Sequence, residues 1–165
     1  MTPSPNPSIR VTRQGRVPLG FTLIELMVAL IILAILVSLA VPSFRDASLS
    51  SRLAGYSNDL VASAQLARSE AIKRNDEVTM CPSSDGTTCD TTAGWEDGWI
   101  VLADSGVVQT YAALQPEFRV TQAGGTDSVV FPPTVAGVTP TSFKVCRADP
   151  VGKEERVVSI SAVGG

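Results

Sequence analysis

The chain has 165 residues, 44% of them hydrophobic and 18% charged, and a formal net charge of −3. This length suffices for one domain and a membrane anchor, but not for two ordinary domains. The chain has no histidine, which excludes Ser–His and Cys–His nucleophile pairs and removes the commonest zinc ligand. Carboxylate-only and Ser–Lys chemistry remain open, but no spacing suggests them. We therefore expect no enzyme, metal site or cofactor.

Charge is unevenly distributed along the sequence. The first 20 residues carry Arg10, Arg13 and Arg16 and no acid. The whole chain carries −3 and this segment +3, so the remainder carries −6. An acidic domain repels a phosphate backbone on average, which disfavours general nucleic-acid binding.

Residues 21–41 form an apolar stretch with no proline, no glycine and a single charge, Glu25. As a helix this stretch is about 31 Å long, which matches the core of a bilayer. The preceding arginines favour a cytoplasmic location for residues 1–20 and export of the following domain. A cleaved signal peptide is less favoured for two reasons. Residues 21–41 are longer than the apolar core of a typical signal peptide, and no small-x-small cleavage site follows them.

Glu25 is the anomaly in the apolar stretch. A carboxylate inside a membrane costs about 2.5–3.5 kcal/mol, so it usually has a function and a partner. The alternative is hydration at the cytoplasmic interface, only one turn into the helix.

The run Gly20-Phe21-Thr22-Leu23-Ile24-Glu25 resembles the class III signal of type IV pilins and type II secretion pseudopilins. The resemblance implies that a prepilin peptidase cleaves between Gly20 and Phe21 and methylates the new amine of Phe21. It also implies that Glu25 is the glutamate used in filament assembly, where it pairs with the Phe21 amine of a neighbouring subunit.

Pro42 is expected to end or kink the first helical segment. The helical period then resumes, and it places one group of residues on a single face. This group is Leu49, Leu53, Tyr56, Leu60, Ala64, Ala67 and Ala71. We expect this face to pack on the chain's own domain.

Beyond Asn75 the pattern changes to short strand-like runs separated by turn signals. The predicted strands are 77–81, 99–103, 107–111, 117–121, 128–131, 142–146 and 156–161. The expected fold is α+β: a long N-terminal helix, transmembrane in its first half, followed by a small antiparallel β-sheet domain. The expected organisation is a cleaved leader at 1–20, a transmembrane and assembly helix at 21–41, an amphipathic helix at 42–75 and a β-rich extracytoplasmic domain at 76–165.

A second set of motifs is similar to the GspH/FimT group of minor pilins and pseudopilins. It comprises Met80-Cys81-Pro82-Ser83, Cys89, Trp95, Gly98-Trp99-Ile100-Val101, Lys144-Val145-Cys146 and the run at 156–161. With the N-terminal signal, the resemblance covers most of residues 20–162.

Three cysteines in an exported domain allow three disulfide pairings. We favour Cys81–Cys89, because turn-forming residues separate them, with Cys146 as a buried thiol in its strand. Cys81–Cys146 and Cys89–Cys146 remain open. Trp95 and Trp99 are expected to anchor loops in the core rather than form a binding platform.

Three functions share this anchor, signal and domain. The favoured one is a minor pilin that primes or enters a type IV pilus, in the service of pilus biogenesis and twitching motility. The first alternative is a GspH-like pseudopilin of type II secretion, and the second is a FimT-like DNA receptor in natural transformation. An unrelated adhesin would not explain Gly20-Phe21 followed by Glu25.

DNA binding is the least favoured of the three. The FimT pattern ends in Gly-Arg-x-Arg, but residues 162–165 contain no arginine. The weak candidates for DNA contact are Lys144, Arg147, Lys153 and Arg156, and acidic residues are interspersed among them. The expected partners are prepilin peptidase, other pilin or pseudopilin subunits and the inner membrane. The expected topology is single-pass, with a periplasmic C-terminal domain that assembles into a pilus or pseudopilus.

Overall fold

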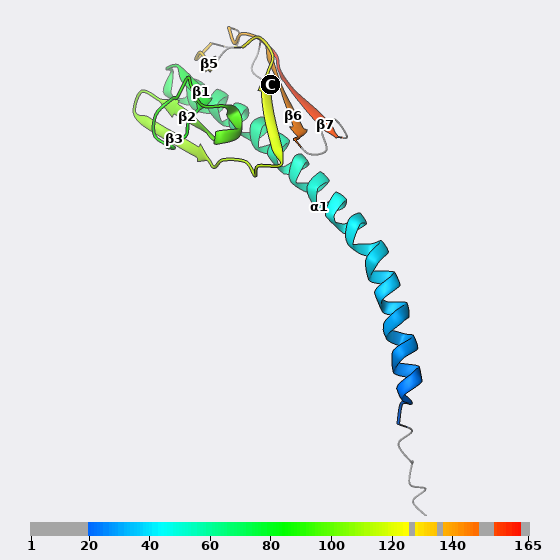
Figure 1. Ribbon diagram of the computed structural model, residues 1–165. Helices are drawn as coiled ribbons and strands as arrows, with labels where there is room; N and C mark the ends of the chain where they lie inside the picture. Colours follow the sequence, from blue (N-terminus) through cyan, green and yellow to red (C-terminus); the bar gives the residue numbers. More distant parts are fainter. Residues whose placement is uncertain (1–19, 126–127, 135–136, 149–153, 163–165) are drawn as a thin grey trace, which may run out of the picture. The chain divides into compact units, whose positions relative to one another are not determined.

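The computed structural model describes residues 20–125, 128–134, 137–148 and 154–162. The chain divides into two compact units, Met1–Pro42 and Ser43–Gly165. One helix, α1 (Leu23–Arg74), contributes to both units, and all the strands belong to the second (Figure 1).

Of the two outcomes expected at Pro42, an end or a kink, the structure excludes the end, because α1 continues through Pro42 to Arg74. A proline removes one backbone hydrogen bond, which by helix geometry is the bond to the carbonyl of Ser38. Apolar helical residues precede Pro42, and prolines are tolerated in membrane helices. Among the described residues, α1 is the one helix long and apolar enough to cross a membrane, judged by length and composition.

The C-terminal end of α1 is closed by local hydrogen bonds. Asn75 adopts a left-handed conformation with φ of 54°. Its N–H bonds the carbonyl of Ile72, and the N–H of Asp76 bonds that of Ala71. This pattern is the Schellman motif, and it satisfies carbonyls that the helix itself leaves open. The change from helical to strand-like sequence pattern at Asn75 therefore coincides with a helix end that is capped by this motif.

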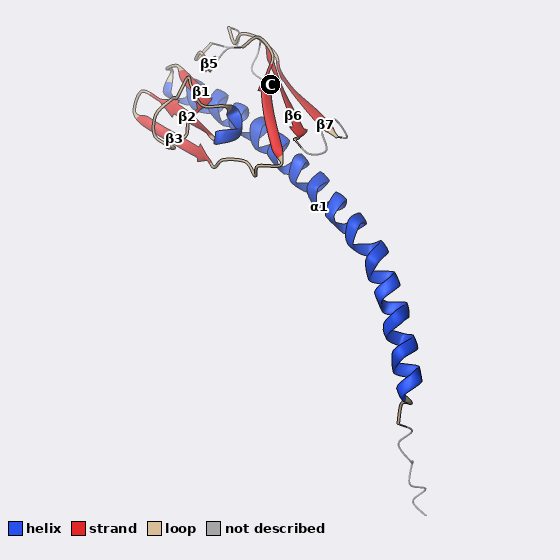
Figure 2. Ribbon diagram, in the orientation of Figure 1, coloured by secondary structure: helices blue, strands red, loops and turns tan. Residues whose placement is uncertain are grey.

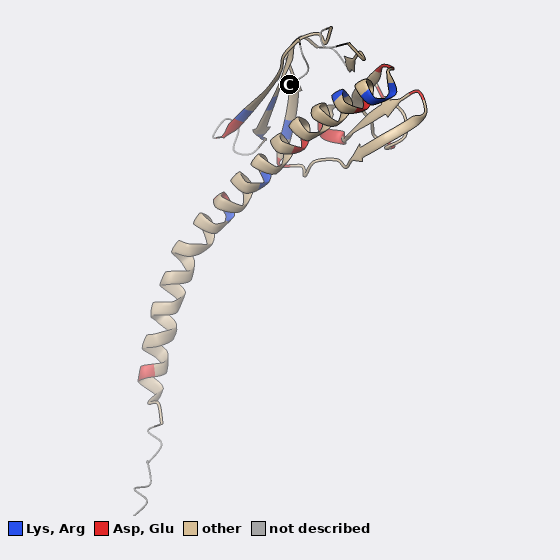
Figure 3. Cartoon of the chain, turned by 180° about the vertical axis from the view of Figure 1, so that it is seen from behind, with Lys and Arg blue, Asp and Glu red and all other residues tan. Residues whose placement is uncertain are grey.

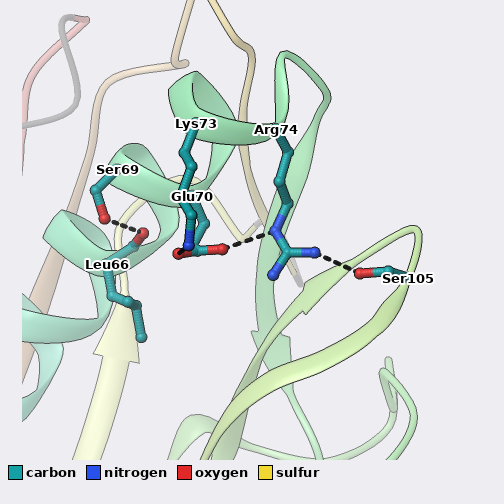
Figure 4. A network of polar contacts seen from close by, with 6 residues as sticks. All are labelled: Leu66, Ser69, Glu70, Lys73, Arg74 and Ser105. Atoms are coloured by element: carbon teal, nitrogen blue, oxygen red, sulfur yellow. Dashed lines mark hydrogen bonds and ion pairs between the residues drawn. The ribbon is translucent and has the colours of Figure 1, made fainter.

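An ionic cluster ties this helix end to the β domain (Figure 4). Glu70 accepts hydrogen bonds from Arg74 Nε at 2.7 Å and Lys73 Nζ at 3.1 Å. These two cations, Arg74 first, lower the pKa of the Glu70 carboxyl. Arg74 also donates to the hydroxyl of Ser105, in the turn between two strands.

Seven strands form two antiparallel sheets (Figure 2). The first sheet has the order β3-β2-β1-β5 and the second the order β4-β6-β7. The strand bounds are β1 Val78–Pro82, β2 Trp99–Ala103, β3 Gly106–Tyr111, β4 Phe118–Gln122, β5 Val129–Phe131, β6 Thr141–Arg147 and β7 Glu155–Ile160. All seven predicted strands are confirmed, with ends shifted by at most a residue or two. The 3₁₀ helix η1 (Trp95–Asp97) was not anticipated.

The core lies between the second unit's part of α1 and the inner faces of the sheets. The helix contributes Leu53, Leu60, Ala64, Ala67 and Ala71, all buried as the helical period predicts, while Leu49 and Tyr56 pack half-buried at its edge. The three alanines leave little side-chain bulk between helix and strands, so the backbones can approach closely.

Trp95 and Trp99 belong to this core, as expected. Trp95 meets Phe143 edge-on at 4.6 Å between ring centroids, and Trp99 stacks on Tyr111 at 5.0 Å. Gly98, which separates η1 from β2, has φ of 107°, and a Cβ there would lie 2.8 Å from the carbonyl oxygen of Tyr111. A glycine is therefore required where the chain turns from η1 into β2.

Candidate functional site

The scissile bond expected between Gly20 and Phe21 lies just before α1. Both residues are non-helical and exposed, and the Phe21 side chain is 85% exposed. A peptidase needs access to backbone that is free of helical hydrogen bonds. The segment presents such backbone two residues ahead of the helix.

Thr22 caps the helix. Its Oγ1 accepts a hydrogen bond from the backbone N–H of Glu25 at 3.2 Å. Thr-x-x-Glu is the spacing of a capping box, in which the threonine satisfies one of the helix's free N–H groups. The resemblance to the pilin signal assigns Thr22 no role, but the Thr-x-x-Glu spacing alone predicts it as a helix cap.

Glu25 lies in the first turn of α1, where the helix dipole favours a negative charge. It borders an open groove of about 370 Å³, lined also by Ile24, Val28, Ala29 and Ile32. The rest of the lining is apolar, and Ala29, four residues beyond Glu25, leaves space beside the carboxylate.

The described apolar side chains of the first unit, in residues 21–41, are all exposed. The exposed fractions include 57% for Ile31, 58% for Leu36 and 69% for Leu39. Soluble monomers rarely present so large an apolar surface, so lipid or partner helices must cover it. Figure 3 shows acidic colouring in the first turns of the helix and basic colouring only further along it.

In the second unit, the structure joins Cys81 and Cys89 in a disulfide with a Cα–Cα distance of 5.5 Å. The favoured pairing is therefore confirmed. The bridged loop returns across the outer face of β2 and β3, where Thr110 donates to the carbonyl of Gly86 at 3.1 Å. Cys81 and its cross-strand neighbour Ile100 are both buried on this face. We attribute that burial to the loop.

Cys146 is free but only half-buried, so the expectation of a buried thiol is wrong. Alternation along β6 explains the difference. Phe143, Val145 and Arg147 are buried on one face of the strand, which places Cys146 on the opposite face.

The weak DNA-contact candidates do not form one basic surface. Lys144 pairs with Glu155 at 2.6 Å, and this carboxylate raises the pKa of the lysine. Arg147 is buried and pairs with Asp46 at 3.2 Å. Arg156 is exposed, but its register opposite Val145 puts it on the other face of the sheet from Lys144. Lys153 lies outside the described residues.

The structure offers little for catalysis or metal binding. No cluster of three or more His, Cys, Asp or Glu suited to a metal occurs among the described residues. The specific polar contacts of the second unit hold loops and helix ends together, as in the Glu70 cluster.

Two family models match the chain. The model described as type II transport protein GspH matches residues 57–164, and the prokaryotic N-terminal methylation motif matches residues 19–41. The first covers most of the β domain and the second the signal and apolar helix. No curated protein matches the chain in sequence.

Solved structures with a similar fold include the type IV minor pilin FimU of Pseudomonas aeruginosa in two crystal forms. The P21 form has a TM-score of 0.54 at 20% identity, covering 70% of this chain and 87% of that one. The P65 form has a TM-score of 0.52 at 20% identity, covering 66% and 86%. The pilin-like fold is thus confirmed. With the two family matches, the chain belongs to the GspH family of pilin-like proteins and carries the prokaryotic N-terminal methylation motif.

Proposed function

We propose that this protein is a minor pilin of a type IV pilus system, stored in the inner membrane and then incorporated into a filament or used to prime one. Residues 1–20 form the leader that prepilin peptidase removes. Residues 21–41 anchor and assemble the subunit, residues 42–75 join the anchor to the domain, and residues 76–165 form its periplasmic part. It acts through interfaces and not as an enzyme.

The observation that carries this proposal is the arrangement at the start of α1. An exposed, non-helical Gly20–Phe21 bond leads directly into a Thr22-capped apolar helix with Glu25 in its first turn. The segment falls inside the match to the methylation motif. Cleavage would place a new cationic amine at Phe21 next to this turn, and methylation keeps its charge. In a filament, that amine and the Glu25 carboxylate of a neighbour offset each other's burial.

The decisive experiment expresses the full chain with and without a prepilin peptidase and determines its intact mass and N-terminal sequence. We expect a terminus at methylated Phe21 only when the peptidase is present. Two controls should leave the chain uncut: an inactive peptidase, and Gly20→Val, which places a branched side chain at the cleavage site. An uncut wild-type chain, or cleavage after residue 41, would contradict the proposal.

A second candidate function is a pseudopilin of type II secretion, which the description of the matching family favours. The minor-pilin function is supported by the fold shared with FimU. Co-purification of the processed subunit with the pilins of each system would distinguish them. Co-purification with type II secretion pseudopilins alone would show that the protein functions in type II secretion.

DNA uptake remains the least favoured function. Of the described candidates for DNA contact, Lys144 and Arg147 are already paired with acids, and Lys144 and Arg156 lie on opposite faces of their sheet. Tight, salt-sensitive DNA binding by the processed subunit would be needed to support DNA uptake as its function.

A further inference from the structure

Most described lysines and arginines already have an acceptor. Arg68 donates to the carbonyl of Pro132. The ion-paired cations are Lys73, Arg74, Arg119, Lys144 and Arg147. Within the described part of the chain, Arg45, Arg52 and Arg156 have no such partner, and all three are exposed; only the first two lie together on α1.

These two arginines line the same groove. They are seven residues apart on α1, which places them on one face of the helix. The groove holds about 320 Å³ and lies between this face and the segment before β4. Ser48 adds a hydroxyl, and the one acid in the lining is Glu117. The lining therefore carries a net positive charge in a domain that is acidic as a whole.

The groove also has an apolar side. Phe44 is 77% exposed and Leu49 is half-buried, and both line the groove. An exposed phenylalanine beside unpaired arginines is the combination that membrane-interface anchors use: the ring packs against acyl chains while the cations reach headgroups.

The distance along the chain places this groove near the bilayer surface. Phe44 follows the apolar stretch, which ends at Val41, by three residues, and three residues span at most about 11 Å. Arg45 is one residue further, and Arg52 lies about two helical turns beyond Arg45. The headgroup region is itself several Å thick.

We propose that this groove binds the phosphate of an anionic phospholipid in the periplasmic leaflet, with Arg45 and Arg52 on the phosphate and Phe44 and Leu49 against the lipid's apolar part. The proposal rests on the membrane anchoring in the proposed function. Such a site holds an acidic domain against an anionic surface that would otherwise repel it.

The test uses the full-length chain in neutral detergent, with lipid retention measured by native mass spectrometry during titration with palmitoyl-oleoyl phosphatidylglycerol or phosphatidylcholine. We expect the wild type to retain phosphatidylglycerol about tenfold better, as two cations at an anionic surface allow. Arg45→Gln/Arg52→Gln should lose this preference. The charge-matched control Arg119→Gln/Arg156→Gln should keep it, and melting curves should show all three folded.

Four results would overturn the proposal. The first is wild-type protein without preference for the anionic lipid, and the second is equal loss in the control variant, which would indicate general charge attraction. The third is displacement of the lipid by an equal concentration of inorganic phosphate. The fourth is a dimer that Arg45→Gln/Arg52→Gln dissociates without changing lipid retention, which would assign the groove to a second copy.

The cleavage assay reports separately on the proposed function, so a chain that is cleaved but shows no lipid preference refutes this inference alone.

Discussion

The hydroxyl of Thr22 decides where α1 begins, and therefore whether the Gly20–Phe21 bond lies in helical or open backbone. Thr22→Val keeps the shape of the side chain but removes the acceptor for the N–H of Glu25. Loss of an N-cap costs about 1 kcal/mol of helix stability and leaves the helix start undefined. We expect the initial rate of leader cleavage by purified prepilin peptidase to fall severalfold.

Thr22→Ser and Thr22→Asn provide the control, because both side chains cap helices well. They should restore the wild-type rate if the cap matters. If the peptidase instead recognises the threonine side chain directly, it should cleave both variants slowly. Equal cleavage rates for Thr22→Val and wild type would show that the cap does not affect leader cleavage.

Asp85 organises the disulfide-bridged loop. It accepts hydrogen bonds from the backbone N–H groups of Thr88 and Thr87 and from both hydroxyls, at 2.8–2.9 Å. These bonds, the Thr88 N–H first, hold the pKa of the carboxyl well below its usual value near 3.8. Because the folded pKa lies below the unfolded one, the stabilisation is complete above about pH 4 and is lost as pH falls toward the folded pKa.

Asp85→Asn should therefore lower Tm at pH 7, and the difference from wild type should narrow below about pH 4. Thermal unfolding of both proteins at pH 7 and pH 2.5 measures this. Asp104→Asn, which changes an exposed carboxyl in a strand turn, is the control and should leave Tm unchanged. A Tm difference that stays constant between the two pH values would show that the charge of Asp85 contributes nothing.

At the scale of elements, the Cys81–Cys89 bridge closes the loop to which we attribute the burial of Ile100 on the outer face of β2. The bridge closes a sequence separation of 8 residues. A loop of this size constrains the unfolded chain by about 2.5 kcal/mol. Cys81→Ser/Cys89→Ser should lower the free energy of unfolding by about this amount and speed amide exchange in β2.

Cys146→Ser is the matched control, because it removes a thiol that forms no bridge. We expect a small change in its denaturant midpoint. Reduction of the wild type should reproduce the loss seen in the double variant. A double variant as stable as the control would mean that the loop is held by Asp85 and Thr110 without the bridge.

The elements could be predicted from the sequence where one local pattern decides them. The period along 49–71 placed five buried residues correctly, and alternation with turn residues located seven strands. The division into two sheets could not be predicted, because pairings such as β1 with β5 join segments about 50 residues apart and depend on competing packing. Cys146 was misplaced because its small, weakly polar side chain suits either face of a strand. The sequence allowed either an end or a kink at Pro42, because the local cost of a proline does not say whether the helix resumes beyond it.

At the scale of the whole molecule, α1 serves two environments with two surfaces. Up to Pro42 its apolar side chains are exposed, and beyond Leu53 one face is buried under the chain's own strands. The candidate functional residues of the first unit could be predicted because the cleavage signal is contiguous in sequence. The groove that contains Arg45 and Arg52 could not, because Gln115 and Glu117 join it from a distant segment.

Glu25 tests whether the exposed first unit is used for assembly. Glu25→Ala removes the one charge of the apolar stretch, so membrane insertion should be at least as favourable as in wild type. In a filament, however, the Phe21 amine of a neighbour would be left buried without its partner, which is strongly destabilising. We expect the share of subunit in sheared filaments to fall about tenfold or more, while the share in the inner membrane rises. Immunoblots of both fractions measure this, with Glu77→Ala, an exposed acid of the second unit, as the control. Glu25→Ala subunits that enter filaments at the wild-type level would show that the apolar surface alone drives assembly.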